Sequence, residues 1–327
     1  MLEYFLERLL QEVMEDFCGH TRSPGDWVSV GSPRLRKTAR VYRIRSSAFP
    51  TEAAVKIFLS EEKGRQHARR LHSALERYSP SDTDAQHVAA PYALVENRKA
   101  VIMEWVDAPP LQRAIHGFPW QRIGRHEAVR KSAEWLKWFH LRAGLTEGPF
   151  DANAALDKIE TLLAKIPAGR RDTSFDTCVT LLFQRAHLVH GHGVMHGCVH
   201  GDFTPYNIMV SRTTAVGIDF LANKNVAVIS DVNRMLTYLF AQRYFPVSAR
   251  MLGPQGCARE DWNAFTQGYG TGLLPVVPEI VLYFQYLEVM RRWSSLLAET
   301  DPPNVLLRYI EIHRVRTMAQ HIAALLS

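Results

Sequence analysis

The stretch CVHGDFTPYNIMVS, residues 198–211, decides how this chain is interpreted. Histidines crowd its approach, so one interpretation is a zinc cluster built from His187, His190, His192 and His196. The other interpretation is a β-hairpin, in which a strand ends at Val199, a polar loop contains Pro205, and the apolar run 208–210 forms the next strand. That loop would place one carboxylate, Asp202, and one amide, Asn207, around a phosphate group.

The zinc interpretation fits the sequence poorly. His192, His196 and His200 are four residues apart, a spacing that would stack metal ligands on one face of a helix. A glycine stands beside each of them, and a helix with so many glycines is unstable. No glutamate lies between them to act as the base of an HExxH site. The glycines instead predict a turn-rich approach to a buried loop.

Composition bounds the class of protein. The chain has 327 residues, of which 46% are hydrophobic and 22% charged, as in ordinary globular proteins. It has neither an apolar stretch of roughly 18 residues nor the features of a signal peptide, so we expect a cytoplasmic protein. The formal net charge is +6, but no recognised nucleic-acid-binding motif accompanies the arginine-rich segment 34–45, so no nucleic-acid partner is expected. Four scattered cysteines without CxxC spacing predict neither disulfides nor a cysteine zinc site.

The pattern of the chain changes near residue 107. Before it, an amphipathic N-terminal helix is followed by short strands, a helix capped by Ser60, and a hairpin over 92–103. After Asp107–Pro110 the pattern is mainly helical, interrupted by strands within 199–220. We predict an α+β fold with a small β-rich lobe over residues 1–106 and a larger helical lobe over residues 107–327.

The residues around the quoted stretch suit phosphoryl transfer. That reaction needs positioning and charge neutralisation more than covalent chemistry from the protein. Asp202 and Asn207, on a loop stiffened by Pro205, can present a carboxylate and an amide oxygen to one space. A second strand, 215–218, ends at Asp219. Because Mg²⁺ prefers oxygen ligands and keeps several waters, one Asp and one Asn together with phosphate oxygens are sufficient to hold it.

The run HGDFTPYNIM, residues 200–209, followed by Ile218-Asp219-Phe220, resembles the aminoglycoside phosphotransferase/choline kinase superfamily, the small-molecule branch of the protein-kinase-like fold. The resemblance implies a bilobal fold with a nucleotide-binding N-lobe, a catalytic loop and acceptor site in the C-lobe, and ATP and Mg²⁺ as cofactors. It implies that Asp202 is the catalytic base, His200 an orienting residue, and Asn207 and Asp219 metal ligands.

The resemblance continues outside the loop. Lys56, in the strand AAVKIF, resembles the lysine that contacts the inner phosphates of ATP. The hinge, whose backbone groups hydrogen-bond adenine, corresponds to Met103, Glu104, Trp105 and Val106. Asp231 resembles the aspartate that braces the catalytic loop from the start of a helix.

Two features depart from the family pattern. The loop over residues 31–36, which should be glycine-rich, contains one glycine, Gly31. The glutamate that should pair with Lys56 is not obvious, because the helix that should carry it reads RQHARR in its middle. Glu62 is the best candidate, with Glu61 and Glu76 as alternatives.

The leading interpretation is a small-molecule kinase that uses ATP and Mg²⁺ to phosphorylate a hydroxyl of a sugar-like compound or metabolite. Residues 232–327 contain nine arginines against seven aspartates and glutamates, so we expect an acceptor that is not strongly cationic. One alternative is a catalytically weak nucleotide-binding regulator, or pseudokinase. Another is a kinase of a protein or an envelope glycan. The N-terminal helix could lie on a membrane, but packing against the small lobe explains it more simply.

Overall fold

A computed structural model gives the fold of the chain, which is α+β as predicted. It describes residues 2–21, 26–35, 38–79, 87–116, 123–220, 222–243, 247–300, 302 and 304–327. The chain divides into two compact units: the first comprises 1–108 with 216–221, and the second comprises 109–215 with 222–327. The sequence analysis had placed 216–221 in the C-terminal lobe.

The first unit is built on an antiparallel sheet with the strand order β1-β3-β4-β7-β6, and β2 pairs with β3. The strands are β1 (Trp27–Ser29), β2 (Arg34–Leu35), β3 (Ala39–Ser46), β4 (Ala53–Phe58), β6 (Pro91–Val95) and β7 (Ala100–Glu104). The predicted hairpin is β6–β7, whose turn is the 3₁₀ segment Glu96–Arg98 followed by Lys99 in the left-handed conformation.

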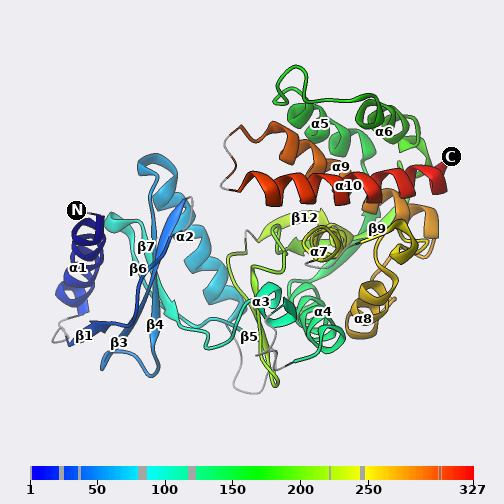
Figure 1. The fold of residues 1–327 in the computed structure, drawn as a ribbon. Helices are drawn as coiled ribbons and strands as arrows, with labels where there is room; N and C mark the ends of the chain where they lie inside the picture. Colours follow the sequence, from blue (N-terminus) through cyan, green and yellow to red (C-terminus); the bar gives the residue numbers. More distant parts are fainter. Residues whose placement is uncertain are drawn as a thin grey trace. The chain divides into compact units, whose positions relative to one another are not determined.

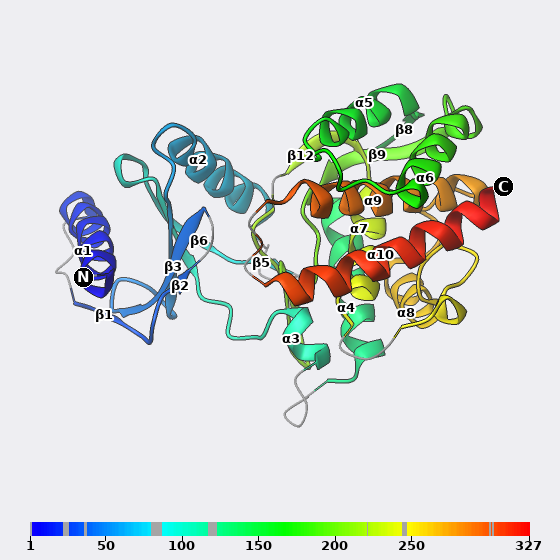
Figure 2. The same ribbon diagram turned by 45° about the horizontal axis from the view of Figure 1, so that its top comes forward.

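Helices α1 (Leu2–Thr21) and α2 (Glu61–Tyr78) cover opposite faces of this sheet (Figures 1 and 2). All six residues of β4 are buried, as expected for a strand covered on both sides. One face of the strand, which includes Val55, packs with α1 residues such as Val13 and Met14. Because side chains alternate along a strand, Lys56 points to the other face. Helix α2 begins as predicted, with the Ser60 hydroxyl accepting a hydrogen bond from the Lys63 N–H at 3.2 Å.

Residues 216–221 join the first unit through a short parallel pairing. Strand β11 (Ala215–Gly217) pairs with β5 (His87–Val88), with Val216 opposite His87. Phe220, which is 3% exposed, packs edge-on against Tyr78 at the end of α2, with ring centroids 6.1 Å apart. These contacts fix Asp219 between two anchored positions of the first unit.

The second unit is mainly helical. Its helices are α3 (Leu111–His116), α4 (Arg125–Arg142), α5 (Ala152–Leu163), α6 (Thr173–Gln184), α7 (Ile229–Ala241), α8 (Arg259–Tyr269), α9 (Pro278–Ala298) and α10 (Val305–Leu326). Helix α9 packs against α5, α7 and α10, and α4 packs against α8. Fourteen of the 21 residues of α9 are buried, including Tyr283, Tyr286 and Trp293, so α9 is the central helix of this unit.

The predicted hairpin is wrong. The strand before the loop belongs to a three-stranded antiparallel sheet with the order β12-β9-β8. Strand β9 (Gly193–Val199) pairs with β8 (Leu145–Pro149) and β12 (Asn223–Ala227), whereas β10 (Ile208–Val210) is not part of this sheet. The predicted turn-rich approach is only partly correct: Gly191 and Gly201, on either side of β9, have φ of +78° and +82°, but Gly193 and Gly197 lie within the strand. A Cβ added to Gly197 would lie 2.7 Å from Leu145 Cδ2 and 3.1 Å from the Gly144 carbonyl oxygen, so a side chain there would force its neighbours to shift.

The strand also bears on the zinc interpretation. His196 lies on β9 and His200 directly follows its last residue, so along an extended chain these two histidines are separated by roughly 13 Å. In the part of the chain that the structure describes, no group of three or more His, Cys, Asp or Glu side chains is placed to hold a metal ion. Among the same residues, no helix combines the length and apolarity needed to cross a bilayer.

Candidate active site

The loop after β9 is held by the carboxylate of Asp231, near the start of α7. Asp231 is 1% exposed and accepts hydrogen bonds from the backbone N–H groups of His200 (2.6 Å) and Gly201 (3.0 Å). His140 Nε2 lies 3.2 Å from the same carboxylate, and His140 Nδ1 is 2.7 Å from the Tyr269 hydroxyl. Burial opposes ionisation of Asp231, but its hydrogen bond with His140 and the surrounding positive charge keep its pKa below the ordinary value.

Gly201 allows the chain to turn at this point. Its φ is +82°, a left-handed conformation that a residue with a side chain rarely adopts. The imidazole of His200 is fully buried, and its Nδ1 accepts a hydrogen bond from the Asp202 N–H at 3.3 Å. Its ring lies among Phe203 and α4 residue Trp135, whose ring centroids are 5.4 and 6.0 Å away. His200 therefore holds the backbone that carries Asp202, which agrees with the orienting role that the resemblance implies.

Asp202 and Asn207 are brought together by the loop. The Asn207 amide nitrogen donates to the Asp202 carboxylate oxygen Oδ2 (2.8 Å) and to the Asp202 carbonyl (2.9 Å), while the Asn207 N–H donates to Thr204 O (2.9 Å). Because the amide nitrogen is used inside the loop, the amide oxygen is directed elsewhere. The Asp202 side chain is 52% exposed, so its carboxylate is accessible to a substrate.

Arg234 is a residue of this loop region that the sequence analysis missed. It lies one turn after Asp231 on α7, and its guanidinium donates to the Gly201 carbonyl. Its Nη1 is also 3.9 Å from Asp202 Oδ1, and its Nε is 3.3 Å from Glu288 on α9. The i,i+3 spacing from Asp231 puts both side chains on the same face of α7, and this was the only available signal in the sequence.

In the first unit, Lys56 and Asp219 form an ion pair. Lys56 Nζ is 2.5 Å from Asp219 Oδ1, and the two side chains are 10% and 32% exposed. Asp219 has a φ of +59°, an uncommon conformation for a residue other than glycine, and one that Asp tolerates better than most. Such backbone strain concentrates at functional positions. The structure therefore pairs two residues that sequence analysis had assigned separately to phosphate and metal binding.

Glu62, the predicted partner of Lys56, lies exposed in the first turn of α2. The structure pairs Lys56 with Asp219 and not with Glu62. The alternative Glu61 forms an ion pair with Lys99, and Glu76 is close to His72 on its own helix, at 3.4 Å. A role for Glu62 in nucleotide binding stays a prediction.

The predicted hinge residues follow one another at the end of β7. Met103 is buried opposite Ala54 of β4. The N–H groups of Glu104 and Trp105 are already engaged, by Ala90 O (2.8 Å) and Glu52 O (2.9 Å). Within the described residues, the Val106 N–H has no protein acceptor. Val106 is thus the hinge residue whose backbone donor is available to a base.

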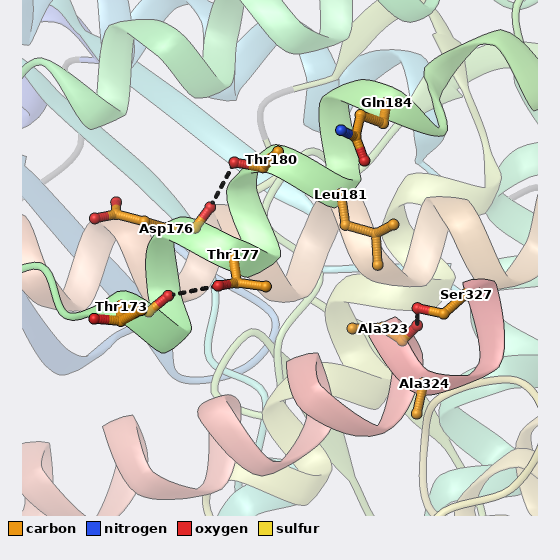
Figure 3. A pocket seen from close by; sticks show the side chains of 9 residues that line it. All are labelled: Thr173, Asp176, Thr177, Thr180, Leu181, Gln184, Ala323, Ala324 and Ser327. Carbon is orange, nitrogen blue, oxygen red and sulfur yellow. Dashed lines mark hydrogen bonds between the residues drawn. The ribbon is translucent and has the colours of Figure 1, made fainter.

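A surface pocket of about 540 Å³ lies in the second unit between α6 and the end of α10 (Figure 3). Its hydroxyls are used internally, because Thr177 and Thr180 donate to the carbonyls of Thr173 and Asp176 within α6. None of the residues predicted from the motifs line this pocket, and we assign it no role in the chemistry.

Comparison with known proteins identifies the fold. No protein-family model matches the chain, and no curated protein sequence matches it. Solved structures do match it. A choline/ethanolamine kinase family protein from Mesorhizobium loti has 11% identity over 97% of this chain and 99% of that one, with a TM-score of 0.60.

Two further matches are amicoumacin kinase in complex with AMP-PNP and Ca²⁺, and spectinomycin phosphotransferase in complex with ADP and spectinomycin. The first has 13% identity over 97% of this chain and 96% of that one, with a TM-score of 0.56. The second has 11% identity over 90% and 92%, with a TM-score of 0.51. The chain therefore has the protein-kinase-like fold that choline kinases share with antibiotic phosphotransferases.

Proposed function

We propose that this protein transfers the terminal phosphoryl group of ATP to a hydroxyl of a small molecule. The observation that carries the proposal is the catalytic loop, in which a braced backbone presents an exposed Asp202 carboxylate hydrogen-bonded to Asn207. Asp202 accepts the proton of the acceptor hydroxyl as it attacks. His200 and Asp231 act on the loop that holds it, as positioning residues.

The side chains fit a hard divalent cation. Asn207 has its amide nitrogen committed to Asp202, which leaves the amide oxygen as a ligand, and Asp219 contributes a carboxylate. Two protein oxygens suit Mg²⁺, which keeps waters and shares ligands with nucleotide phosphates. When bound, the ion neutralises the charge that develops on the phosphates during transfer.

Lys56 and the hinge support nucleotide binding. The Lys56 ammonium is almost buried, so its charge acts strongly on a phosphate that enters beside it. The backbone of Val106 supplies the hydrogen bond to adenine. Two matched structures of this fold hold nucleotides, as AMP-PNP in one and ADP in the other.

The test is calorimetric titration of the wild-type protein with AMP-PNP in the presence and absence of Mg²⁺. We expect binding that requires Mg²⁺, is lost in Asp219→Asn, and is weakened about tenfold or more in Lys56→Met. A matched control is Asp157→Asn, which removes an exposed carboxylate on α5. Mg²⁺-dependent binding that survives Asp219→Asn would contradict the assignment.

A second candidate, a weak nucleotide-binding regulator, is favoured by one observation: Lys56 pairs with Asp219 rather than with a glutamate of α2. Slow release of ADP from ATP with water as the acceptor separates the two functions. A kinase shows Mg²⁺-dependent hydrolysis that Asp202→Asn reduces, whereas a regulator binds nucleotide without hydrolysing it.

A further inference from the structure

One face of α7 is only partly buried, and it lies beside the catalytic carboxylate. Arg234 and Tyr238, four residues apart, are half-buried, whereas the residues between them are buried. Arg234 Nη1 lies 3.9 Å from Asp202 Oδ1. Burial raises the pKa of the Tyr238 hydroxyl, the charges of Arg292 and Arg291 lower it, and those of Glu288 and Asp202 raise it. An acceptor whose hydroxyl reaches Asp202 therefore meets this face of the second unit.

The carboxylates near this face are already neutralised. Glu288 is 6% exposed; its Oε2 accepts from Arg291 Nε at 2.7 Å, and its Oε1 accepts from Arg291 Nη2 and from Arg234 Nε. Glu311 on α10 accepts from Arg292 Nε at 2.9 Å and Arg292 Nη2 at 2.6 Å. An ammonium group would find neither carboxylate available, so the site is poorly suited to a cationic acceptor.

Arg291 and Arg292, by contrast, each have hydrogen-bond donors that the carboxylates do not use. Each guanidinium has five N–H groups, and in the described part of the chain the Nη1 groups of Arg291 and Arg292 donate to no protein acceptor. The Arg292 guanidinium lies over the Tyr238 ring, with its Cζ 4.6 Å from the ring centroid. The positive charges of Arg234, Arg291 and Arg292 face two carboxylates, which leaves one net positive charge before Asp202 is counted.

We propose that the acceptor is a hydroxyl compound that also carries an oxyanion group, a phosphate or a carboxylate, which Arg291 and Arg292 bind. This rests on the proposed phosphotransferase function and specifies its substrate class. A guanidinium edge matches an oxyanion by paired, charge-assisted hydrogen bonds. A cationic acceptor would need free carboxylates, whereas Glu288 and Glu311 are already paired with arginines.

The first experiment measures ADP release with matched acceptor pairs and cationic controls. The pairs are glycerol with glycerol 3-phosphate, glucose with glucose 6-phosphate, ribose with ribose 5-phosphate, and glycerol with glycerate. Choline, ethanolamine and kanamycin are the cationic controls. We expect at least one anionic member to stimulate ADP release at a concentration tenfold or more below that of its neutral partner. Phosphate and carboxylate are told apart by which pair responds.

The second experiment tests Arg292 with a double variant that removes both charges of its ion pair and with a single variant that removes only the carboxylate. In Arg292→Gln/Glu311→Gln both charges are removed, and KM for the anionic acceptor should rise about 10- to 100-fold, with kcat changed by less than about threefold. Glu311→Gln alone frees Arg292 and should lower the same KM several-fold. Arg171→Gln/Asp176→Asn, which removes both charges of an exposed ion pair on α6 and the loop before it, is the charge-matched control for the double variant and should behave as the wild type.

The outcomes separate the two proposals. Faster turnover of a cationic or neutral acceptor than of every anionic one overturns the oxyanion inference and leaves the kinase function standing. The inference is equally contradicted if no anionic member stimulates ADP release while Mg²⁺-dependent AMP-PNP binding is intact, or if Glu311→Gln and the double variant shift KM in the same direction. Absence of nucleotide binding in the wild type removes the kinase proposal itself, and the inference with it.

Discussion

Asp202 and Asn207 are hydrogen-bonded to each other, so in the proposed site one loop holds both the general base and a metal ligand. The hydrogen bond from the amide nitrogen fixes the carboxylate as an acceptor and turns the amide oxygen outward. A carboxylate that is half-exposed and held by its own loop is accessible to a hydroxyl. A general base in this position typically contributes 10²- to 10⁴-fold to the rate.

We predict that Asp202→Asn lowers kcat by at least about 10²-fold and leaves the affinity for Mg²⁺ and AMP-PNP within about threefold. The amide still accepts the Asn207 hydrogen bond, so the loop should keep its shape. Steady-state ADP release and calorimetry measure the two quantities. Asp157→Asn is the control, and a variant at position 202 with wild-type kcat would refute the role.

Some residues of the candidate site could be predicted from the sequence, and others could not. The spacing of Asp202, Asn207 and Asp219 was enough to nominate them, because a loop and a strand end constrain where such side chains point. The contacts of Arg234 and Glu288 with the loop region were not predicted. They arise because α7 packs against α9, and no local sequence pattern indicates that packing. Glu62 shows the converse: its place in a first helical turn did not determine its partner.

At the scale of elements, strand β9 determines where the loop that carries Asp202 begins within the second unit. The glycines of β9 suggested turns, but they lie within the strand. Side chains of β8 fill the space beside them: Leu145 lies where a Cβ at Gly197 would be, and Glu147 where a Cβ at Gly193 would be. The sequence could not reveal this, because the need for glycine is set by a strand some fifty residues away. Regular patterns with local causes, such as the Ser60 cap of α2, were predicted correctly.

We predict that Gly197→Ala lowers the free energy of unfolding by about 1–3 kcal/mol, because the new Cβ would lie 2.7 Å from Leu145 Cδ2 and 3.1 Å from the Gly144 carbonyl. Urea unfolding followed by circular dichroism measures the change. Gly124→Ala is the matched control, since nothing lies within 4 Å of its added Cβ. Equal stability of the two variants would contradict the packing of β8 on β9.

For the molecule as a whole, burial and nearby arginines make the stability depend on pH through one histidine, His116. Burial lowers the pKa of His116, at the end of α3, to about 4, and the charges of Arg125, Arg243 and Arg314 lower it further, against the opposing charge of Asp261. The unfolded chain binds a proton on this histidine below about pH 6.5, and the folded chain only below about pH 4. Stability from this residue is therefore complete above pH 6.5 and is lost as the pH falls toward 4.

We predict that the free energy of unfolding falls by about 1–2 kcal/mol more in the wild type than in His116→Gln between pH 7.5 and pH 4.5. The full shift would give roughly 3 kcal/mol, and the half-buried position of the ring reduces it. Urea unfolding at several pH values measures both proteins. Parallel pH profiles would show that His116 does not titrate in this window.

The central claim is that Asp219 and Asn207 supply the oxygen ligands of one divalent cation on the nucleotide. The most direct measurement is a crystal structure with AMP-PNP and Mn²⁺, in which anomalous scattering locates the metal. We predict a metal peak bonded at about 2.0–2.2 Å to a carboxylate oxygen of Asp219 and to the amide oxygen of Asn207, with Lys56 moved onto a phosphate. A metal held by other side chains, or a nucleotide bound while Lys56 stays on Asp219, would contradict the account.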